Sequence, residues 1–461
     1  MAAPLSEEDL SVLQEDGVLL PGPQAGKRKI SASFVLTPPS LGSSSAAGTI
    51  SSTKSTASVR YCDTHSHQDI PDFPDEQESA PALEYIGLQP ATAKEIFDRW
   101  QSRPDPDQNP DELLDYVYGH ISWLKQTSWQ GYSDAEALQR LGVAPWLRSV
   151  LLDPRFKDIY ETETLRFWLN ETFRGNYRSI ATIQQQLKAY VKDRKNEKKK
   201  QKRASIKDAF QSPPGEASSS SDPTALAQHV ATMSLASDSG HLPQTQISIG
   251  AAEPILPDHK IFYKAKAVNE MSENHMFIAE DGSINMRAIS SHRGGDFNPV
   301  DHAWYWTPEY ETAVKYRDWA VHRVRSGEVV ILRIQVPGSF LQTLRQEDLW
   351  FSASWKEYIW ACKKQLPPKD IPSKFTKYWK PGPEQTDIML GHICSGVAPK
   401  IARIRPNEVQ TAINEDKVLK IGNNKATQWV VMHEDVAEKL AIQVRGKMHI
   451  EIFAATEPKD Q

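Results

Sequence analysis

The chain contains 461 residues, which at roughly 150 residues per domain allows about three domains. Only 39% of the residues are hydrophobic and the 31 prolines outnumber the 23 glycines, so we expect part of the chain not to fold. Apolar runs stay well short of the ~20 residues that a transmembrane helix needs, which excludes a membrane-embedded protein. The net charge of −5 restricts any contact with nucleic acid to a local basic segment.

Cysteine use indicates a reducing compartment. Cys62, Cys362 and Cys394 are too few and too scattered for a disulfide framework. The acidic first residues also lack the basic flank and apolar core of a secretory signal. We therefore expect an intracellular protein, in the cytoplasm, the nucleus or both. Cys62, His65 and His67 are metal-ligand residue types, but a polar tail would not fix their geometry, so no metal site is predicted.

Residues 1–81 are predicted to form a disordered tail. Serine, threonine, proline and glycine dominate residues 26–80, which end in an acidic stretch. Such a composition buries too little apolar surface to offset roughly 1 to 2 kcal/mol of backbone entropy per ordered residue. The apolar residues between Leu10 and Leu20 are either a transient docking segment or an apolar patch within this tail.

Residues 82–205 have the apolar spacing of helices. Ala93, Ile96, Phe97 and Trp100 lie three or four residues apart, and similar patterns follow as far as residue 191. Ser133 with Glu136 three residues later predicts a capping box at a helix start. We predict a compact all-helical domain that binds a protein partner whose identity the sequence does not indicate.

The helical region ends in a basic run, Arg194–Arg203, in which only Glu197 carries the opposite charge. Such a run suits a nuclear-import receptor, an anionic membrane surface or a nucleic-acid backbone. It is equally explained as a solvated helix end whose lysines interact favourably with the helix dipole. No aromatic residue interrupts the run, which argues against base stacking. The serine-rich residues 206–249 are predicted to form a flexible linker.

Residues 250–456 are predicted to form an α+β domain, because short apolar runs alternate with amphipathic segments. Val329–Val336 is a typical strand, with Gly327 and Pro337 at its ends, and Glu309–Val324 has a helical pattern. The phosphate-binding Gly-Lys-Ser/Thr loop, the dinucleotide fingerprint, the Gly-x-Ser-x-Gly elbow and the His-Glu-x-x-His motif are all absent from the chain.

The same region carries an ordered series of motifs. The series runs Ile261–Ala265, Trp304–Pro308 directly before a helix, Trp355–Trp360, Thr386–Gly391 and Thr427–Val431. In this order the motifs resemble those of ADP-ribosyltransferase-like domains of an uncharacterised bacterial and fungal type. The resemblance covers about residues 258 to 456. It implies a split antiparallel sheet and a mono-ADP-ribosyltransferase that uses NAD as co-substrate to modify a protein or another acceptor.

The resemblance also implies a set of site residues. Cleavage of the nicotinamide–ribose bond passes through an oxocarbenium-like state, so the site needs a carboxylate near the ribose and an aromatic wall beside the nicotinamide. Glu357 would then be the catalytic acid that holds the ribose hydroxyl and orients the acceptor. The residues implied to bind NAD are Tyr263 and Lys264 on the first strand, Tyr305 and Trp306 as stacking partners, and Thr307 as a hydrogen-bond partner.

One departure from the family pattern leaves a second hypothesis open. Lys264 stands where the family has histidine or arginine, and its flexible amine does not supply the same fixed hydrogen bond. The domain could therefore be a catalytically inactive transferase-like fold that acts as a protein-interaction module. Under this hypothesis Glu357 is a solvent-facing helix residue, and the aromatic cluster Trp304–Trp306 belongs to the core.

Overall fold

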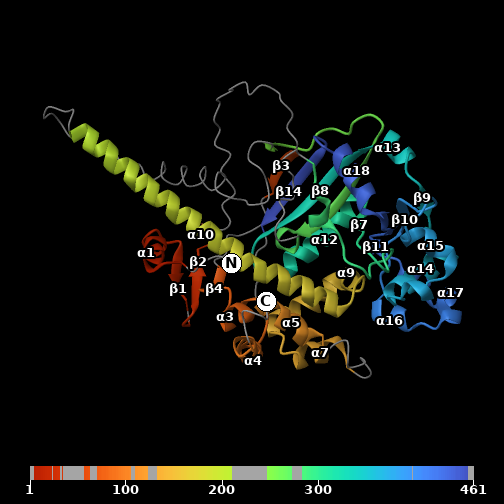
Figure 1. The fold of residues 1–461 in the computed structure, drawn as a ribbon, viewed down its shortest axis with the longest axis horizontal. Helices are drawn as coiled ribbons and strands as arrows, with labels where there is room; N and C mark the ends of the chain where they lie inside the picture. Colours follow the sequence, from red (N-terminus) through yellow and green to blue (C-terminus); the bar gives the residue numbers. More distant parts are fainter. Residues whose placement is uncertain are drawn as a thin grey trace.

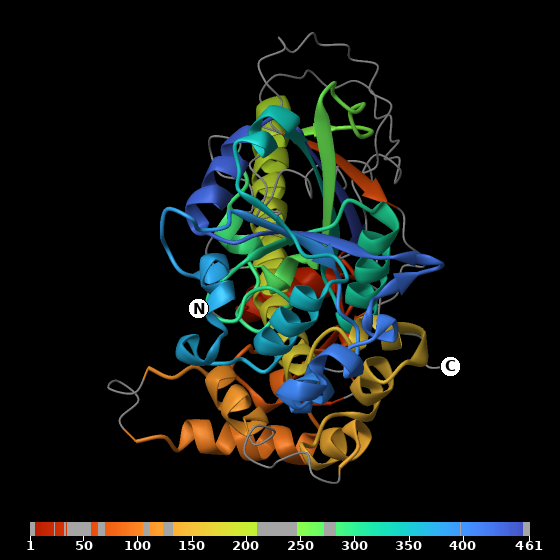
Figure 2. The ribbon, with the colours of Figure 1, turned by 90° about the vertical axis from the view of Figure 1, so that its right-hand side faces the viewer.

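The protein has a mixed α/β structure with open sheets on one side of a long helix. The computed structural model describes residues 5–22, 24–31, 34, 57–62, 70–104, 110–122, 132–209, 247–271, 283–396 and 398–454. The long helix α10 (Leu165–Ala209) crosses the molecule (Figure 1). The earlier helices lie below α10 and the larger sheets above it, and a view from the side shows the same two layers (Figure 2).

The first described residues are ordered against α10. They form helix α1 and an antiparallel sheet of order β1-β2-β4. Leu13, Ile30 and Phe73 are buried in the same core as Leu187 and Val191 of α10. The predicted disorder of residues 1–81 is therefore wrong for these segments, because α10 supplies the apolar surface that their own composition lacks. The elements are α1 (Glu7–Glu15), β1 (Leu19–Pro21), β2 (Lys27–Ile30) and β4 (Ile70–Pro74).

Every helix or strand named between residues 80 and 209 of the described chain is a helix, as the apolar spacing predicts, and one isolated antiparallel bridge pairs Leu88 with Val143. The Ser133–Glu136 capping box is confirmed, since the Glu136 amide donates to Ser133 Oγ and the Ser133 amide donates to Glu136 Oε2. Helix α10 includes the basic run and residues 206–209 of the predicted linker, whereas residues 210–246 of that linker lie outside the described residues. The helices are α3 (Ala80–Tyr85), α4 (Pro90–Gln101), α5 (Leu113–Ile121), α7 (Asp134–Arg140), α8 (Pro145–Leu151), η1 (Pro154–Phe156), α9 (Lys157–Tyr160) and α10.

Two larger sheets form the rest of the described chain. The five-stranded sheet has the order β5-β3-β14-β8-β6, and the four-stranded sheet has the order β7-β13-β10-β9. Pairing is antiparallel between most neighbours, but β3 pairs in parallel with β14 and β5, and β9 pairs in parallel with β10. These three pairs depart from the split antiparallel sheet that the resemblance implies. The strands are β3 (Ala57–Cys62), β5 (Ile247–Ile249), β6 (His259–Ala267), β7 (Trp304–Trp306), β8 (Glu328–Pro337), β9 (Gln346–Asp348), β10 (Ile388–His392), β13 (Thr427–Val431) and β14 (Met448–Ala454).

Helices cover the sheets and connect their strands. They are α12 (Tyr310–Arg323), α13 (Gly338–Gln342), α14 (Ala353–Lys363), α15 (Thr376–Trp379), α16 (Ala398–Arg403), α17 (Val409–Ala412) and α18 (Glu434–Gln443). Single 3-10 turns are η3 (Val268–Glu270), η4 (Met286–Ile289), η5 (Pro368–Asp370), η6 (Ser373–Phe375), η7 (Pro406–Glu408) and η8 (Glu415–Lys417), and a small hairpin joins β11 (Lys420–Ile421) to β12 (Asn424–Lys425).

The helical region and the α+β region pack against each other, and Trp319, Ile393 and Leu419 of the α+β region belong to the core of the helical region. Trp319 of α12 is 1% exposed and packs among aromatic rings of the helical region. Its ring centroid lies 5.4 Å from that of Phe156 and 5.5 Å from that of Trp168. The apolar spacing of α12 predicted a buried face but did not indicate which part of the chain would cover it.

A buried ion cluster crosses the same boundary. Lys363 Nζ of α14 lies 3.0 Å from Glu163 Oε1 and 3.0 Å from Asp296 Oδ1, and donates to the Thr162 carbonyl at 2.8 Å. Only 1% of the Lys363 side chain is exposed. Burial alone would lower the pKa of Lys363, but Glu163 and Asp296 raise it. The amine is therefore charged, and the two regions are joined by an ion cluster in which Lys363 and Asp296 are buried and Glu163 is 19% exposed.

The Lys363→Met substitution should destabilise the whole chain. It removes the cation and leaves two carboxylates buried without their partner, which costs about 3 to 5 kcal/mol. Lys364→Met is the matched control, because Lys364 is the next residue and is exposed, and its cost should stay below about 1 kcal/mol. Chemical denaturation of both variants measures the difference. Equal free energies of unfolding would contradict a role for Lys363 in joining the two regions.

Candidate functional site

Five of the six predicted site residues meet where the two large sheets join. The Tyr263 amide donates to the Thr307 carbonyl at 2.7 Å, and the Thr307 amide donates to the Tyr263 carbonyl at 3.0 Å. This single antiparallel bridge connects β6 to the residue after β7. In a continued ladder Ala265 would face Tyr305, but the bridge is isolated and the two strands part there. We call this point, with Tyr263, Lys264 and residues 305–307, the fork.

The Lys264 amine takes the place of the missing ladder bond. Lys264 Nζ donates to the Tyr305 carbonyl at 3.1 Å. Burial, with Lys266 nearby on the same strand, lowers the pKa of Lys264 to about 7. A Lys264 amine that satisfies a main-chain carbonyl at the fork therefore has a structural role, which the sequence did not predict.

Tyr305 is held by hydrogen bonds within the chain. Its hydroxyl donates to Asn298 Oδ1 at 2.6 Å and accepts from the Phe297 amide at 2.9 Å. Gly295 lies so close that a Cβ atom there would be 2.6 Å from this hydroxyl. Burial raises the pKa of Tyr305 well above its ordinary value. The hydroxyl already has both partners that such a group commonly uses, and the ring is fixed beside the Phe297 loop.

The neighbouring tryptophans belong to the core. Trp304 and Trp306 are each 3% exposed and pack in the core between the sheets. Trp304 Nε1 donates to the Met286 carbonyl at 2.6 Å. Trp306 Nε1 is buried without a hydrogen-bond partner among the described residues. Trp306 therefore presents little surface on which a ligand could stack, and the cluster fits the alternative interpretation that these rings form part of the core.

Thr307 leads to a carboxylate that the sequence analysis did not select. Thr307 Oγ1 donates to Glu309 Oε2 at 2.5 Å, and the Thr427 amide donates to the same oxygen at 3.3 Å. The Thr427 hydroxyl donates to Glu309 Oε1. Glu309 thus connects the end of β7 to the start of β13. Its position directly after Thr-Pro was visible in the sequence, but its second partner lies 118 residues further along the chain.

Glu357, the predicted catalytic acid, is not at the fork. It lies on α14, whose buried face includes Trp355, Tyr358 and Ile359. The Glu357 carboxylate instead forms an ion pair with Lys374, and 29% of its side chain is exposed. Within the described residues it makes no hydrogen bond or ion pair with the fork. The next residue, Tyr358, does contact the loop that binds Tyr305. The Tyr358 hydroxyl donates to the Phe297 carbonyl at 3.3 Å.

An exposed aromatic residue lies beside Thr427. His392 of β10 pairs with Thr427 of β13, and the ring centroid of Trp350 lies 5.6 Å from that of His392. Trp350 is 39% exposed and has a φ of 38°, which is strained for any residue except glycine. Partial burial lowers the pKa of His392, which favours its neutral form. The sequence carried no signal for this pair.

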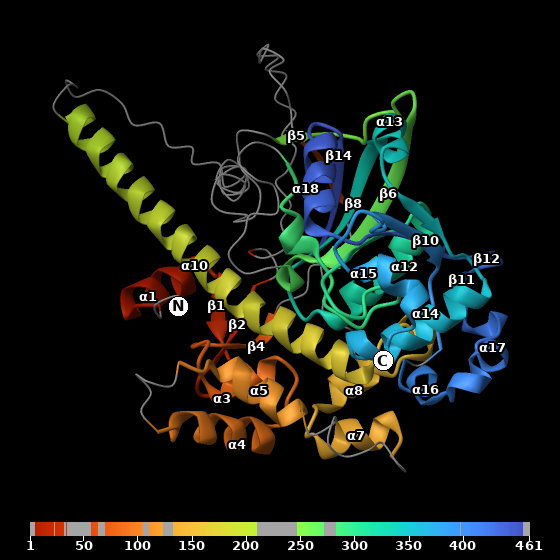
Figure 3. The same cartoon turned by 45° about the vertical axis from the view of Figure 1, so that its right-hand side comes forward.

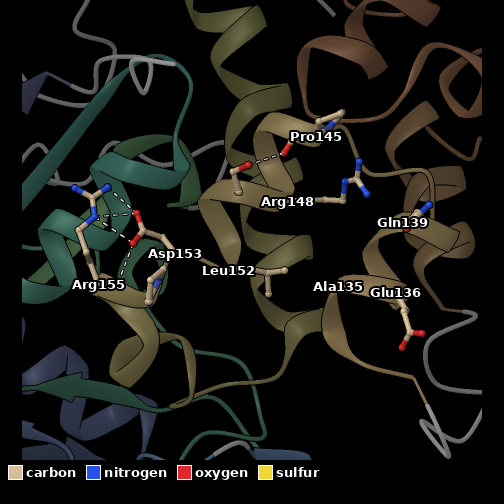
Figure 4. A pocket seen from close by; sticks show the side chains of 10 residues that line it. Ala135, Glu136, Gln139, Pro145, Arg148, Leu152, Asp153 and Arg155 are labelled. Atoms are coloured by element: carbon tan, nitrogen blue, oxygen red, sulfur yellow. Dashed lines mark hydrogen bonds and ion pairs between the residues drawn. The ribbon is translucent and has the colours of Figure 1, made fainter. Parts of the chain in front are cut away.

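A surface hollow of about 780 Å³ lies on the helical region instead (Figure 4). Arg148, Leu152 and Arg155 line it together with Glu136 and Pro145, and Arg155 points toward Asp153. None of the predicted site residues lines this hollow. It is open to solvent, and both carboxylates and guanidinium groups border it.

Comparisons with known proteins assign no family. No protein-family model matches the chain, and no curated protein or solved structure shows significant similarity to it. Across the described ranges, histidine, cysteine, aspartate and glutamate side chains form no group of three that could hold a metal ion. Cys62 lies in β3, whereas His65 and His67 are outside the described residues. Of the helices that the structure describes, none combines the length and the apolar composition needed to cross a bilayer.

The fork lysine should leave a signature in the pH dependence of stability. The pKa of Lys264 is about 7 in the folded chain, whereas the ordinary pKa of a solvated lysine, expected in the unfolded chain, is 10.5. Between these values the unfolded state binds more protons, so the free energy of unfolding should rise with pH. Lys264→Met should remove this part of the rise. Denaturant titrations at several pH values measure it, and identical pH profiles for the two proteins would contradict a charge cost at the fork.

Proposed function

We propose that residues 250–456 form a transferase-like fold that serves as a protein-interaction module and does not catalyse ADP-ribosyl transfer. One observation carries this proposal: the Glu357 carboxylate is engaged by Lys374 and makes no bond to the fork. The fork groups are engaged as well, since Lys264 binds a main-chain carbonyl and Tyr305 binds Asn298. The residues of the resemblance thus hold one another in place.

The resemblance to ADP-ribosyltransferase-like domains is supported by the order of the motifs and by the meeting of two sheets at the Tyr263–Thr307 bridge. The resemblance alone does not supply the features that an NAD site requires. An NAD site needs an accessible aromatic wall and a carboxylate free to contact the ribose. Here Trp306 is 3% exposed, and the carboxylate nearest the fork in the hydrogen-bond network, Glu309, accepts bonds from Thr307 and Thr427. These residues do not fit NAD in this arrangement.

The proposed location is intracellular, in the cytoplasm, the nucleus or both. Cys62, Cys362 and Cys394 are all free thiols, and the latter two are buried. A reducing compartment suits such a set of thiols. We propose that the helical region, with its open hollow at Arg148 and Arg155, contacts a protein partner in addition to the module of residues 250–456.

Isothermal titration of the full chain with millimolar NAD should show no binding heat, and incubation should consume no NAD. Glu357→Gln and Glu309→Gln variants provide the controls. Saturable heat together with NAD consumption would contradict the proposal. If Glu357→Gln alone abolished that consumption, Glu357 would be the catalytic acid. If only Glu309→Gln abolished it, the chain would be a transferase that uses the unpredicted carboxylate.

The structural role of Glu357 can be measured independently of NAD. Glu357→Gln and Lys374→Gln should each lower the free energy of unfolding by at most about 1 kcal/mol, because the ion pair is partly exposed. The double variant should cost less than the sum of the two single changes, since both remove the same interaction. Fully additive costs in a double-mutant cycle would show that Glu357 does not depend on Lys374.

A further inference from the structure

A densely charged segment lies near the C-terminal end of α10. Residues 192–203 contain eight lysine and arginine residues, two acidic residues and no apolar residue. Because successive residues of a helix turn by about 100°, these eight positions spread over about two thirds of the helix circumference, and Asp193, Glu197 and Gln201 occupy the remaining third. The end of α10 extends past the other described elements (Figures 1 and 3). We call residues 192–203 the basic segment.

An acidic helix covers part of the basic segment. Helix α1 lies beside α10 in both views (Figures 1 and 3). Asp16 binds Arg194 with both carboxylate oxygens, each at 2.8 Å. Asp9 lies 2.9 Å from Lys195 Nζ, and Glu15 lies 3.9 Å from Lys198 Nζ. The Arg194 guanidinium holds the pKa of Asp16 below its usual range, so these pairs are charged at neutral pH.

Apolar packing fixes the position of α1 against α10, while the ion pairs of α1 with Lys195 and Lys198 are weak. Leu13 is fully buried against the core of α10, and Ser6 caps the first turn. The pairs of Lys195 and Lys198 are partly exposed, since 42% and 59% of these side chains are accessible, whereas Arg194 and Asp16 are only 21% and 14% exposed. Partly exposed ion pairs are individually weak and are screened by salt. A denser array of negative charge can therefore displace the carboxylates of α1.

We propose that the basic segment binds the phosphate backbone of duplex DNA and that α1 is a built-in acidic cover that competes with DNA for Arg194, Lys195 and Lys198. Cations spread over about two thirds of the circumference of one helix can face both rows of phosphates in the major groove, which admits an α-helix. The major groove of double-stranded RNA is too narrow for this.

Two other anionic surfaces fit the segment less well. A helix that lies on a bilayer inserts an apolar face, and residues 192–203 have none. Single-stranded nucleic acid is bound through stacking on aromatic side chains, which the segment also lacks. The overall charge of −5 does not favour a polyanion, so any binding must come from this segment. This inference does not depend on the transferase-like fold proposed for residues 250–456.

Fluorescence anisotropy of the full chain with a labelled duplex of ~20 base pairs tests the partner. With four phosphate contacts, affinity should fall by about 50-fold when the salt concentration is tripled. Lys198→Gln with Lys199→Gln should weaken binding to every duplex sequence and reduce the slope of log affinity against log salt by about 1.8. An unchanged slope in this variant would overturn the assignment of the basic segment.

The cover is tested by single changes at the two ends of α1, at its first residue Glu7 and at its C-cap Asp16. Asp16→Asn frees Arg194 for a further phosphate contact and should raise affinity by about fivefold to tenfold at ~100 mM salt. Glu7→Gln removes the same charge from the same helix, but Glu7 makes no ion pair in the described structure, so its effect should be much smaller. Equal effects of the two substitutions would overturn competition by α1, because they would reflect net charge alone.

Vesicles of phosphatidylcholine with ~30% phosphatidylserine separate DNA from an anionic membrane. Under the proposal, the lysine substitutions weaken binding to the duplex more than they weaken binding to the vesicles. If the lysine substitutions weakened vesicle binding more than duplex binding, the partner would be a membrane and the DNA assignment would be wrong. Circular dichroism of each variant confirms that α1 and α10 keep their helical content, so that loss of folding is not mistaken for loss of contact.

Discussion

A single buried amine constrains much of the structure. Removing an ammonium group from water costs several kcal/mol unless opposite charges and hydrogen-bond acceptors replace the solvent. Lys363 meets this requirement with Glu163 from the helical region, Asp296 from the α+β region and the Thr162 carbonyl. Neither region can move away without leaving charge buried and unpaired. Trp319 and the hydrogen bond from the Arg323 guanidinium to Thr172 Oγ1 add apolar and polar contacts across the same boundary.

The same cluster also determines the geometry of the fork. While Asp296 Oδ1 faces Lys363, its other oxygen accepts bonds from the Cys394 amide and from Gln428 Nε2. Asp296 is therefore fixed, and the next two residues of its loop, Phe297 and Asn298, supply both hydrogen bonds of the Tyr305 hydroxyl. An ion pair at the boundary between regions thus leads through one short loop to the point where the sheets separate. Polar groups at the fork that could bind a ligand are instead hydrogen-bonded within the chain.

Local sequence patterns predicted what local interactions determine. The helices of residues 82–205, the Ser133 capping box and the strand β8 follow from apolar spacing and turn residues. Local patterns could not predict that α1, β1 and β2 are folded. Leu13 and Ile30 are buried against Leu187 and Val191 of α10, more than 150 residues further along the chain. Likewise, Glu309 binds Thr427 across 118 residues. Glu357 was selected by motif position alone, and the spacing of α14 did not indicate that its carboxylate would face Lys374.

We infer that the helical region and the α+β region form one cooperative unit closed around the Lys363 cluster. Native-state hydrogen exchange at increasing denaturant tests it most directly, because it reports the opening free energy of each amide. The amides of residues 169–173 in α10 and those of residues 330–334 in β8 should share one opening free energy and one denaturant dependence. If the α10 amides exchanged through a lower-energy opening that left β8 protected, the two regions would be separate units and the claim would be wrong.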